Sequence, residues 1–135
     1  MKTWEISLPL FIETGVRKRK KYYMNLNAYK QWHYKESNSI KRIYTMQVGK
    51  LIKHLPKLGK IKLSYTIHYP TKRKYDVDNI GAVTSKFFQD TLVTFEKLED
   101  DNLDFIPEIV YKSGDYDKDN PRVDCIIEEL KDDTN

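Results

Sequence analysis

The residues of this chain best suited to bind a metal ion are acidic residues on either side of one predicted helix. Asp76 and Asp78 are two positions apart, and in an extended backbone this spacing directs both side chains to one side. A second acidic pair, Asp100 and Asp101, follows the amphipathic stretch from Ile80 to Phe95. If both acidic segments fold against each other, three carboxylates meet, and carboxylate oxygens suit a hard divalent cation.

We predict a metal site formed by Asp76, Asp78 and Asp101, with Asp100 as the alternative third ligand. Carboxylates this close repel one another unless a cation lies between them. Mg²⁺ fits such an oxygen site, with Mn²⁺ as a substitute, and it can make a water molecule acidic enough to attack phosphorus. The sequence therefore favours metal-dependent hydrolysis of a phosphodiester.

The charge of the chain is divided unevenly along the sequence. Residues 1–75 contain 18 Lys and Arg against 3 acidic residues, whereas residues 76–135 contain 6 against 17. A polyanion such as DNA is the simplest partner for the basic half. The alternative is that the two halves neutralise each other across the fold. The residues expected to contact DNA phosphates are Arg17, Lys18, Arg19, Lys20, Lys72, Arg73 and Lys74.

An aromatic-rich segment follows the basic run at residues 17–21. Such residues suit stacking on nucleic acid, and they equally suit a hairpin packed on the core, so both interpretations stay open. The residues concerned are Tyr22, Tyr23, Tyr29, Trp32, His33 and Tyr34.

Lys86 is a candidate catalytic cation within the predicted helix. It lies eight residues after Asp78, which on a helix corresponds to about 80° of rotation and ~12 Å of rise. A lysine there can place its charge on the scissile phosphate or orient a water molecule. The alternative is a surface lysine paired with Asp90 four residues later.

The hydrophobic pattern predicts one small domain over residues 1–135, with an α/β (mixed α+β) sheet of four or five strands and two main helices. Alternating apolar residues indicate strands, of which Ile61–Tyr69 is the clearest, and His68 on its polar face is expected to face solvent. Asp78 is the expected N-cap of the second helix. The other predicted elements are strands at Trp4–Leu8, Phe105–Tyr111 and Arg122–Leu130, a helix over Ile40–Leu55 that could begin as early as Asn27, and a flexible tail at 131–135.

Other classes of protein are disfavoured by composition. The single cysteine, Cys125, excludes an internal disulfide and a multi-cysteine zinc site, and its alternating surroundings place it in the core. No signal-peptide pattern is present, and no apolar run approaches the ~20 residues of a membrane span. We therefore expect a cytoplasmic location and no membrane partner.

Three segments carry a resemblance to a known family. They are Asp76-Val77-Asp78-Asn79-Ile80, the helical Lys86-Phe87-Phe88-Gln89-Asp90-Thr91-Leu92, and Glu99-Asp100-Asp101-Asn102. In this order and spacing they resemble the RusA-type Holliday junction resolvases. The opening Ile6-Ser7-Leu8-Pro9 is similar to the first strand of that family, and Tyr111 to Val123 is similar to versions carried by phages and prophages.

The resemblance implies a small dimeric fold that uses Mg²⁺ or Mn²⁺ to cut paired strands of four-way DNA junctions during recombination and repair. It also implies an infected or lysogenic bacterial host. The essential aspartates of the family match Asp76, Asp78 and Asp101, and its catalytic lysine matches Lys86 best. The usual lysine position holds Ala82, so that match requires one added helical turn of four residues.

Two other functions fit parts of the sequence. The first is a non-catalytic basic DNA-binding module whose acidic half contacts a protein partner. The second is a nuclease of the restriction-enzyme type, which would use the E-x-K pattern of Glu129 and Lys131.

Overall fold

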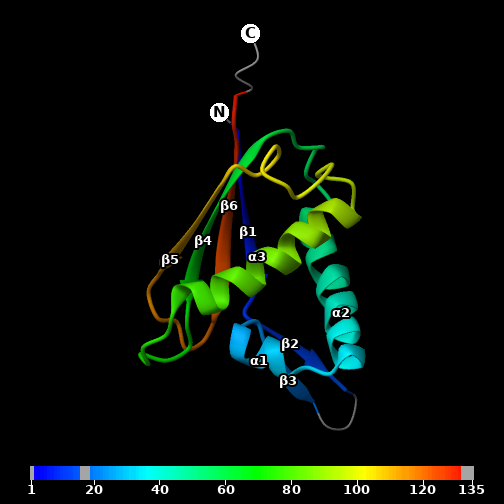
Figure 1. Cartoon of the computed structure of the whole chain (residues 1–135). Helices are drawn as coiled ribbons and strands as arrows, with labels where there is room; N and C mark the ends of the chain where they lie inside the picture. The colour runs from blue at the N-terminus through cyan, green and yellow to red at the C-terminus, as the bar shows by residue number, and fades with distance from the viewer. Residues whose placement is uncertain (1, 16–18, 132–135) are drawn as a thin grey trace.

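The computed structural model describes residues 2–15 and 19–131, and its centre is a four-stranded mixed sheet (Figure 1). The strands follow the order β1-β6-β4-β5, and only the β4–β5 pair is parallel. Their bounds are β1 Thr3–Pro9, β4 Ile61–His68, β5 Glu108–Ser113 and β6 Arg122–Glu129. The mixed α+β class and the single small domain are thereby confirmed.

The helices lie on one side of this sheet. Helix α3, Val77–Thr94, connects β4 to β5 and crosses the face of the sheet, while α2, Tyr34–Ile52, packs against α3 away from the sheet (Figure 1). The short helix α1, Leu26–Gln31, lies against the first half of α3. This arrangement extends α3 from one end of the sheet to the other.

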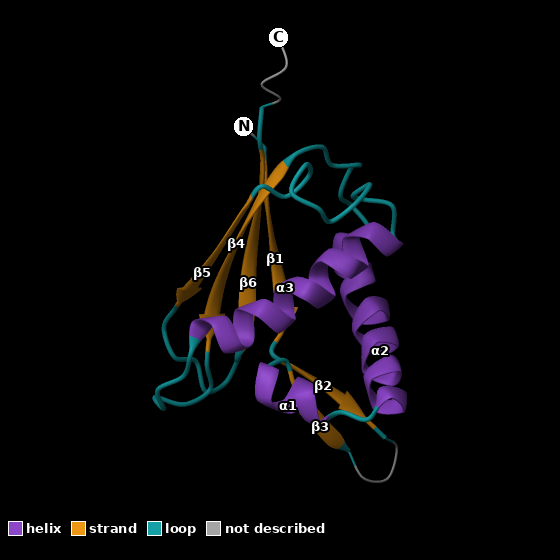
Figure 2. Ribbon diagram, in the orientation of Figure 1, coloured by secondary structure: helices purple, strands orange, loops and turns teal. Residues whose placement is uncertain are grey.

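Part of the basic, aromatic segment, Lys20–Tyr23, lies in a separate hairpin rather than in the main sheet. Strands β2, Phe11–Thr14, and β3, Lys20–Tyr23, pair antiparallel near α1 and the start of α2 (Figure 2). The helix predicted from Asn27 onward is divided in two. The break falls at Trp32, whose extended backbone (φ −71°, ψ 128°) ends α1, and at His33, which caps α2 through Nδ1.

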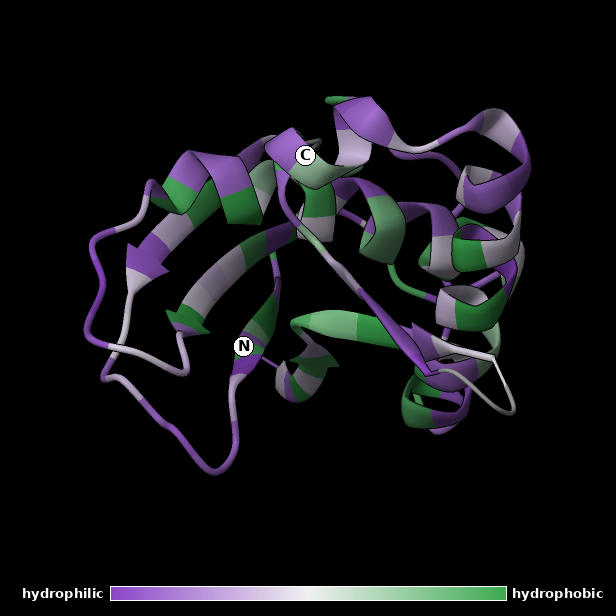
Figure 3. Ribbon diagram, turned by 90° about the horizontal axis from the view of Figure 1, so that it is seen from below, coloured by the Kyte–Doolittle hydropathy of each residue, from purple (hydrophilic) through white to green (hydrophobic). Residues whose placement is uncertain are grey.

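The hydrophobic pattern of the sequence corresponds closely to the buried residues. Along β4 every second residue is fully buried, and α3 packs on β4 and β5 while α2 contacts β1. Green segments in Figure 3 gather in the strands and helices, and the peripheral loops are mainly hydrophilic. The largest fully buried side chains are Tyr44, Tyr65 and Phe88. Cys125 is buried as expected, and burial raises the pKa of its thiol far above the ordinary range.

Within the described ranges, none of the helices combines the length and the apolar character that crossing a bilayer requires.

Candidate functional site

Asp76 and Asp78 lie at the N-terminal end of α3. Asp76 is the N-cap, with an extended backbone (φ −91°, ψ 121°) and no side-chain capping bond, whereas Asp78 is in the first helical turn. The predicted capping role of Asp78 is therefore wrong, and so is the extended spacing, because the helix begins between the two residues. Both side chains are exposed, and the positive end of the helix dipole favours carboxylates there.

Asn79 fixes this acidic end against α1. Its Oδ1 accepts a hydrogen bond of 3.0 Å from the backbone N–H of Leu26, the first residue of α1. Asn25 caps the same helix by accepting from Ala28 N–H at 2.8 Å. No role for Asn79 was predicted from the sequence, and the only signal of one is its place in the first turn of α3, next to Asp78.

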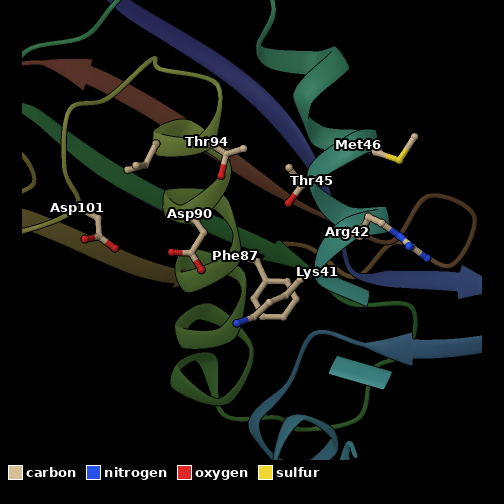
Figure 4. A pocket seen from close by; sticks show the side chains of 9 residues that line it. Lys41, Arg42, Thr45, Met46, Phe87, Asp90, Thr94 and Asp101 are labelled. Carbon is tan, nitrogen blue, oxygen red and sulfur yellow. The ribbon is translucent and has the colours of Figure 1, made fainter. Parts of the chain in front are cut away.

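Asp101 lies beyond the opposite end of α3. It lines a pocket of about 600 Å³ between α2 and α3, together with Asp90, Phe87 and Lys41 (Figure 4). The side chain of Lys41 reaches from α2 across Phe87 toward α3. Two carboxylates and two cations, Lys41 and Arg42, therefore line this pocket, at the far end of the helix from Asp76.

The geometry of the second acidic pair distinguishes its two members. The carboxylate of Asp100 accepts hydrogen bonds from the Asp101 N–H at 2.7 Å and from the Asn102 side chain at 3.0 Å. Asp100 therefore stabilises its own loop. Within the described residues the Asp101 carboxylate forms no such bond, which favours Asp101 as the residue available to a ligand.

The three predicted metal ligands do not form one cluster within a chain. Asp90, which shares the pocket of Asp101, follows Asp78 by twelve residues of helix, a rise of roughly 18 Å. Among the described residues, no three His, Cys, Asp or Glu side chains are placed as a metal site requires. One chain thus presents two carboxylates at one end of α3 and the third at the other.

Lys86 lies on the exposed side of α3, between these two acidic ends. Within the described part of the chain it forms no salt bridge, so the alternative pairing with Asp90 is not present. Ala82, one turn earlier, is half-buried. The lysine is therefore free to meet a ligand that lies along this side of the helix.

The cations that precede Asp76 are exposed. Lys72, Arg73 and Lys74 form the loop between β4 and α3, and among the described residues none of them has a carboxylate partner. Arg19 and Lys20 lie near carboxylates of Glu13 and Glu36, at 3.5 and 3.6 Å. The other two predicted phosphate contacts, Arg17 and Lys18, lie outside the described residues.

The two oppositely charged halves of the sequence do not neutralise each other through direct ion pairs. Among the described residues, Lys62 with Glu108, at 3.4 Å, is the only pair of a Lys or Arg with a carboxylate that joins residues 1–75 to residues 76–135. The excess positive charge of the first half therefore remains available to a partner.

Most of the aromatic segment packs inward. Tyr29, Trp32 and Tyr44 all lie edge-on to the buried Phe87 ring, with centroids 5.4 to 6.3 Å apart. Packing rather than nucleic-acid stacking thus accounts for Tyr29 and Trp32. By contrast, Tyr34 is 66% exposed and contacts the neighbouring His33 ring.

The prediction that His68 faces solvent is wrong, because its side chain is only 16% exposed and belongs to a polar network. Its Nε2 lies 3.2 Å from an oxygen of Asp124, and its Nδ1 lies 2.8 Å from the Asp115 carbonyl. Arg122 donates to both Asp124 and Asp117 at 3.0 Å. The backbone N–H of Asn120, helped by Arg122, holds the pKa of Asp117 below its ordinary value. These contacts fix the loop between β5 and β6 on the sheet.

Comparison with protein-family models and with curated proteins found no match for this chain. The resemblance to the RusA-type resolvases therefore stays a prediction from the motif residues. Glu129, in the E-x-K pattern, ends β6 at the edge of another pocket, about 710 Å³ in volume, whose described lining includes Asp104.

Proposed function

We propose that this protein is a metal-dependent endonuclease that cuts branched DNA, such as four-way junctions, and acts as a homodimer. The observation that carries the proposal is the direct succession of the exposed cations Lys72–Lys74 and the exposed carboxylates Asp76 and Asp78. The cations attract a phosphate backbone, and the carboxylates supply hard oxygen ligands beside it.

The residues of one end of α3 match the ligand chemistry of Mg²⁺, which is commonly held by one or two carboxylates together with substrate phosphates and water. When bound, Mg²⁺ supplies charge stabilisation and a more acidic water. The protein itself would hold the phosphate backbone with its basic loop and direct Asp76 and Asp78 toward it. Lys86 would contribute a cation farther along the same helix.

A second copy explains why the third aspartate lies far from the first two. If two chains place their α3 helices side by side in opposite directions, Asp101 of each copy approaches Asp76 and Asp78 of the other. Such a two-fold arrangement contains two equivalent sites. It provides one site for each of the two strands cut in a symmetric junction.

The test is a two-colour cleavage assay on a labelled four-way junction, with and without Mg²⁺. We expect paired nicks on opposite strands that require the metal, and a dimer by light scattering. A linear duplex of the same sequence serves as the control substrate, and it should be cut far less. Metal-independent products, or equal cutting of the linear duplex, would contradict the proposal.

The second candidate is a non-catalytic DNA-binding module whose acidic half contacts a protein. The absence of a three-carboxylate group among the described residues of one chain favours it. This candidate predicts tight, salt-sensitive binding of the junction and no metal-dependent product on any branched DNA.

A further inference from the structure

A basic, aromatic pocket lies beside the N-terminal end of α3, between the β4–α3 loop and the β5–β6 loop. Its volume is about 410 Å³. Both loops lie at the same end of the sheet, at the lower left of Figure 1. None of the described residues that line it is acidic, whereas the pocket of Asp101 contains both signs of charge. Its principal lining residues are Tyr69, Tyr75, Tyr116, Lys72, Arg73 and Lys74.

The two loops that form this pocket are tied together by hydrogen bonds. The backbone N–H of Gly114 donates to the Ile67 carbonyl, and the N–H of Asp117 donates to the Tyr69 carbonyl, both at 2.8 Å. The hydroxyl of Tyr75 lies 2.8 Å from Ser113 Oγ. The pocket is therefore formed without a ligand, and a ligand would not have to order these loops on binding.

The three tyrosines play different parts. The rings of Tyr69 and Tyr75 stack on each other, 4.8 Å apart and inclined by 22°, and so form one wall. Tyr116 is 48% exposed, and it has the Lys72 ammonium group 5.4 Å from its ring centre. A contact of this kind at an exposed site is weaker than the stacking of a nucleobase on an aromatic ring. A nucleotide can therefore displace Lys72 from the ring.

We propose that this pocket holds one unstacked nucleotide of the bound DNA. Its base lies on Tyr116, and its phosphate is held by Lys72 and the neighbouring cations. The inference rests on the proposed function for its substrate, since Asp76 directly follows Tyr75 and a nucleotide held here brings the adjoining phosphodiester to the carboxylates.

Such a pocket gives a physical basis for preferring branched DNA. An intact duplex offers no free base, and removing one from the stack costs free energy that is smallest where pairing is already disturbed. At a branch point, a base leaves the stack at a lower cost in free energy. The pocket would thus favour branched DNA over an intact duplex without distinguishing among the four bases, because every base has an aromatic face.

The test measures binding in the absence of metal. The wild-type protein and three variants are compared for their affinity for a short oligothymidylate strand and for a blunt duplex of equal length. We expect Tyr116→Ala to weaken binding of the strand about tenfold and to leave duplex binding unchanged. Tyr116→Phe should retain wild-type affinity because the ring is kept. The slope of affinity against salt should not change in Tyr116→Ala, since no phosphate contact is removed.

Phe95→Ala is the control, because Phe95 is another exposed aromatic residue and lies at the opposite end of α3, outside this pocket. Equal loss of strand affinity in Phe95→Ala and Tyr116→Ala would overturn the proposal, as would equal loss on strand and duplex or no loss at all. The assay contains no metal, so its result is independent of cleavage. If the protein shows the expected binding pattern but cuts no junction, the pocket proposal is supported and the proposed nuclease function is contradicted.

Discussion

The two ends of α3 present similar acidic residues in different surroundings. At the N-terminal end, Asp76 and Asp78 lie beside three exposed cations and an aromatic pocket. At the C-terminal end, Asp101 shares a pocket with Asp90, Lys41 and an apolar wall (Figure 4). In the proposed function, the first end contacts the phosphate backbone and the second contacts the second copy of the chain. Among the described residues, neither end brings three metal-ligating side chains together within one chain.

The largest expected effect is on chemistry at the N-terminal end. Asp78→Asn should reduce Mg²⁺-dependent junction cleavage by at least about a hundredfold, because one oxygen ligand loses its charge. Junction binding, measured by gel shift in the absence of metal, should persist because the basic loop is unchanged. Asp119→Asn, on an exposed loop outside the acidic pairs, is the control and should cleave normally. Joint loss of binding and cleavage in Asp78→Asn would contradict the assigned division of roles.

The two ends of α3 should also differ in how well their packing tolerates an added methyl group. A Cβ added at Gly81 would lie 2.5 Å from the Tyr111 ring, near its base, so that the helix or β5 must shift. We expect Gly81→Ala to lower the free energy of unfolding by about 1–3 kcal/mol. At Gly49 the added Cβ meets the far end of the Phe95 ring, which is 39% exposed and can swing outward. Gly49→Ala should therefore cost less.

Urea denaturation followed by circular dichroism measures both glycine variants. Gly59→Ala is the control, since nothing lies within 4 Å of a Cβ added there. A larger loss at Gly49 than at Gly81 would show that the C-terminal end of α3 is the more tightly packed of the two.

A smaller effect is expected on DNA affinity. Lys74→Ala should lessen the log–log dependence of duplex binding on salt by roughly 0.9, the value for one released phosphate contact. Lys57→Ala, an exposed loop lysine near the C-terminal end of α3, should leave the slope unchanged. Fluorescence anisotropy over a range of salt concentrations gives both slopes. Equal salt slopes for Lys74→Ala and Lys57→Ala would contradict the claim that the N-terminal end of α3, and not the C-terminal end, contacts DNA phosphates.

The smallest expected effect concerns the loop that borders the aromatic pocket. The pKa of Asp117 is lowered in the folded state by hydrogen bonds from Asn120 and Arg122. Its stabilising contribution is therefore complete above its ordinary value of 3.8 and is lost as pH falls through the lower folded-state value. Asp117→Asn should melt slightly below wild type near neutral pH, and the difference should shrink in acid. A constant difference in melting temperature across this pH range would argue against that role.

Much of the fold could be predicted from the sequence because its elements have strong periodicity. The alternation along β4 and the apolar stripe of α3 identified both elements to within a few residues. The central place of β6 and the parallel pairing of β5 could not be predicted, because strand order depends on contacts between distant segments. Similarly, nothing in the local pattern at Trp32 signals that its packing against Phe87 accompanies a break between two helices.

The candidate site was predicted in part. The sequence placed Asp76 and Asp78 near the start of α3, Asp101 beyond its end and the exposed basic loop before it, but the expected meeting of the three carboxylates is not seen within one chain. Spacing alone could not show that Asp101 folds toward α2, because the path of residues 95–107 is set by tertiary contacts such as the Leu58 N–H to Lys97 carbonyl bond of 2.7 Å. Nor could it show that Asn79 binds α1 instead of a ligand.

The most direct test of the central claim, that two copies share each acidic site, is to mix Asp78→Asn with Asp101→Asn. Each variant alone should fail to nick a junction. In a mixed dimer one site carries both substitutions and the other carries none. With random pairing, mixed dimers should therefore restore about a quarter of wild-type nicking, and each junction should be nicked in one strand instead of two. If the mixture stays inactive although subunits exchange, or if Asp101→Asn alone cleaves like wild type, shared sites are ruled out.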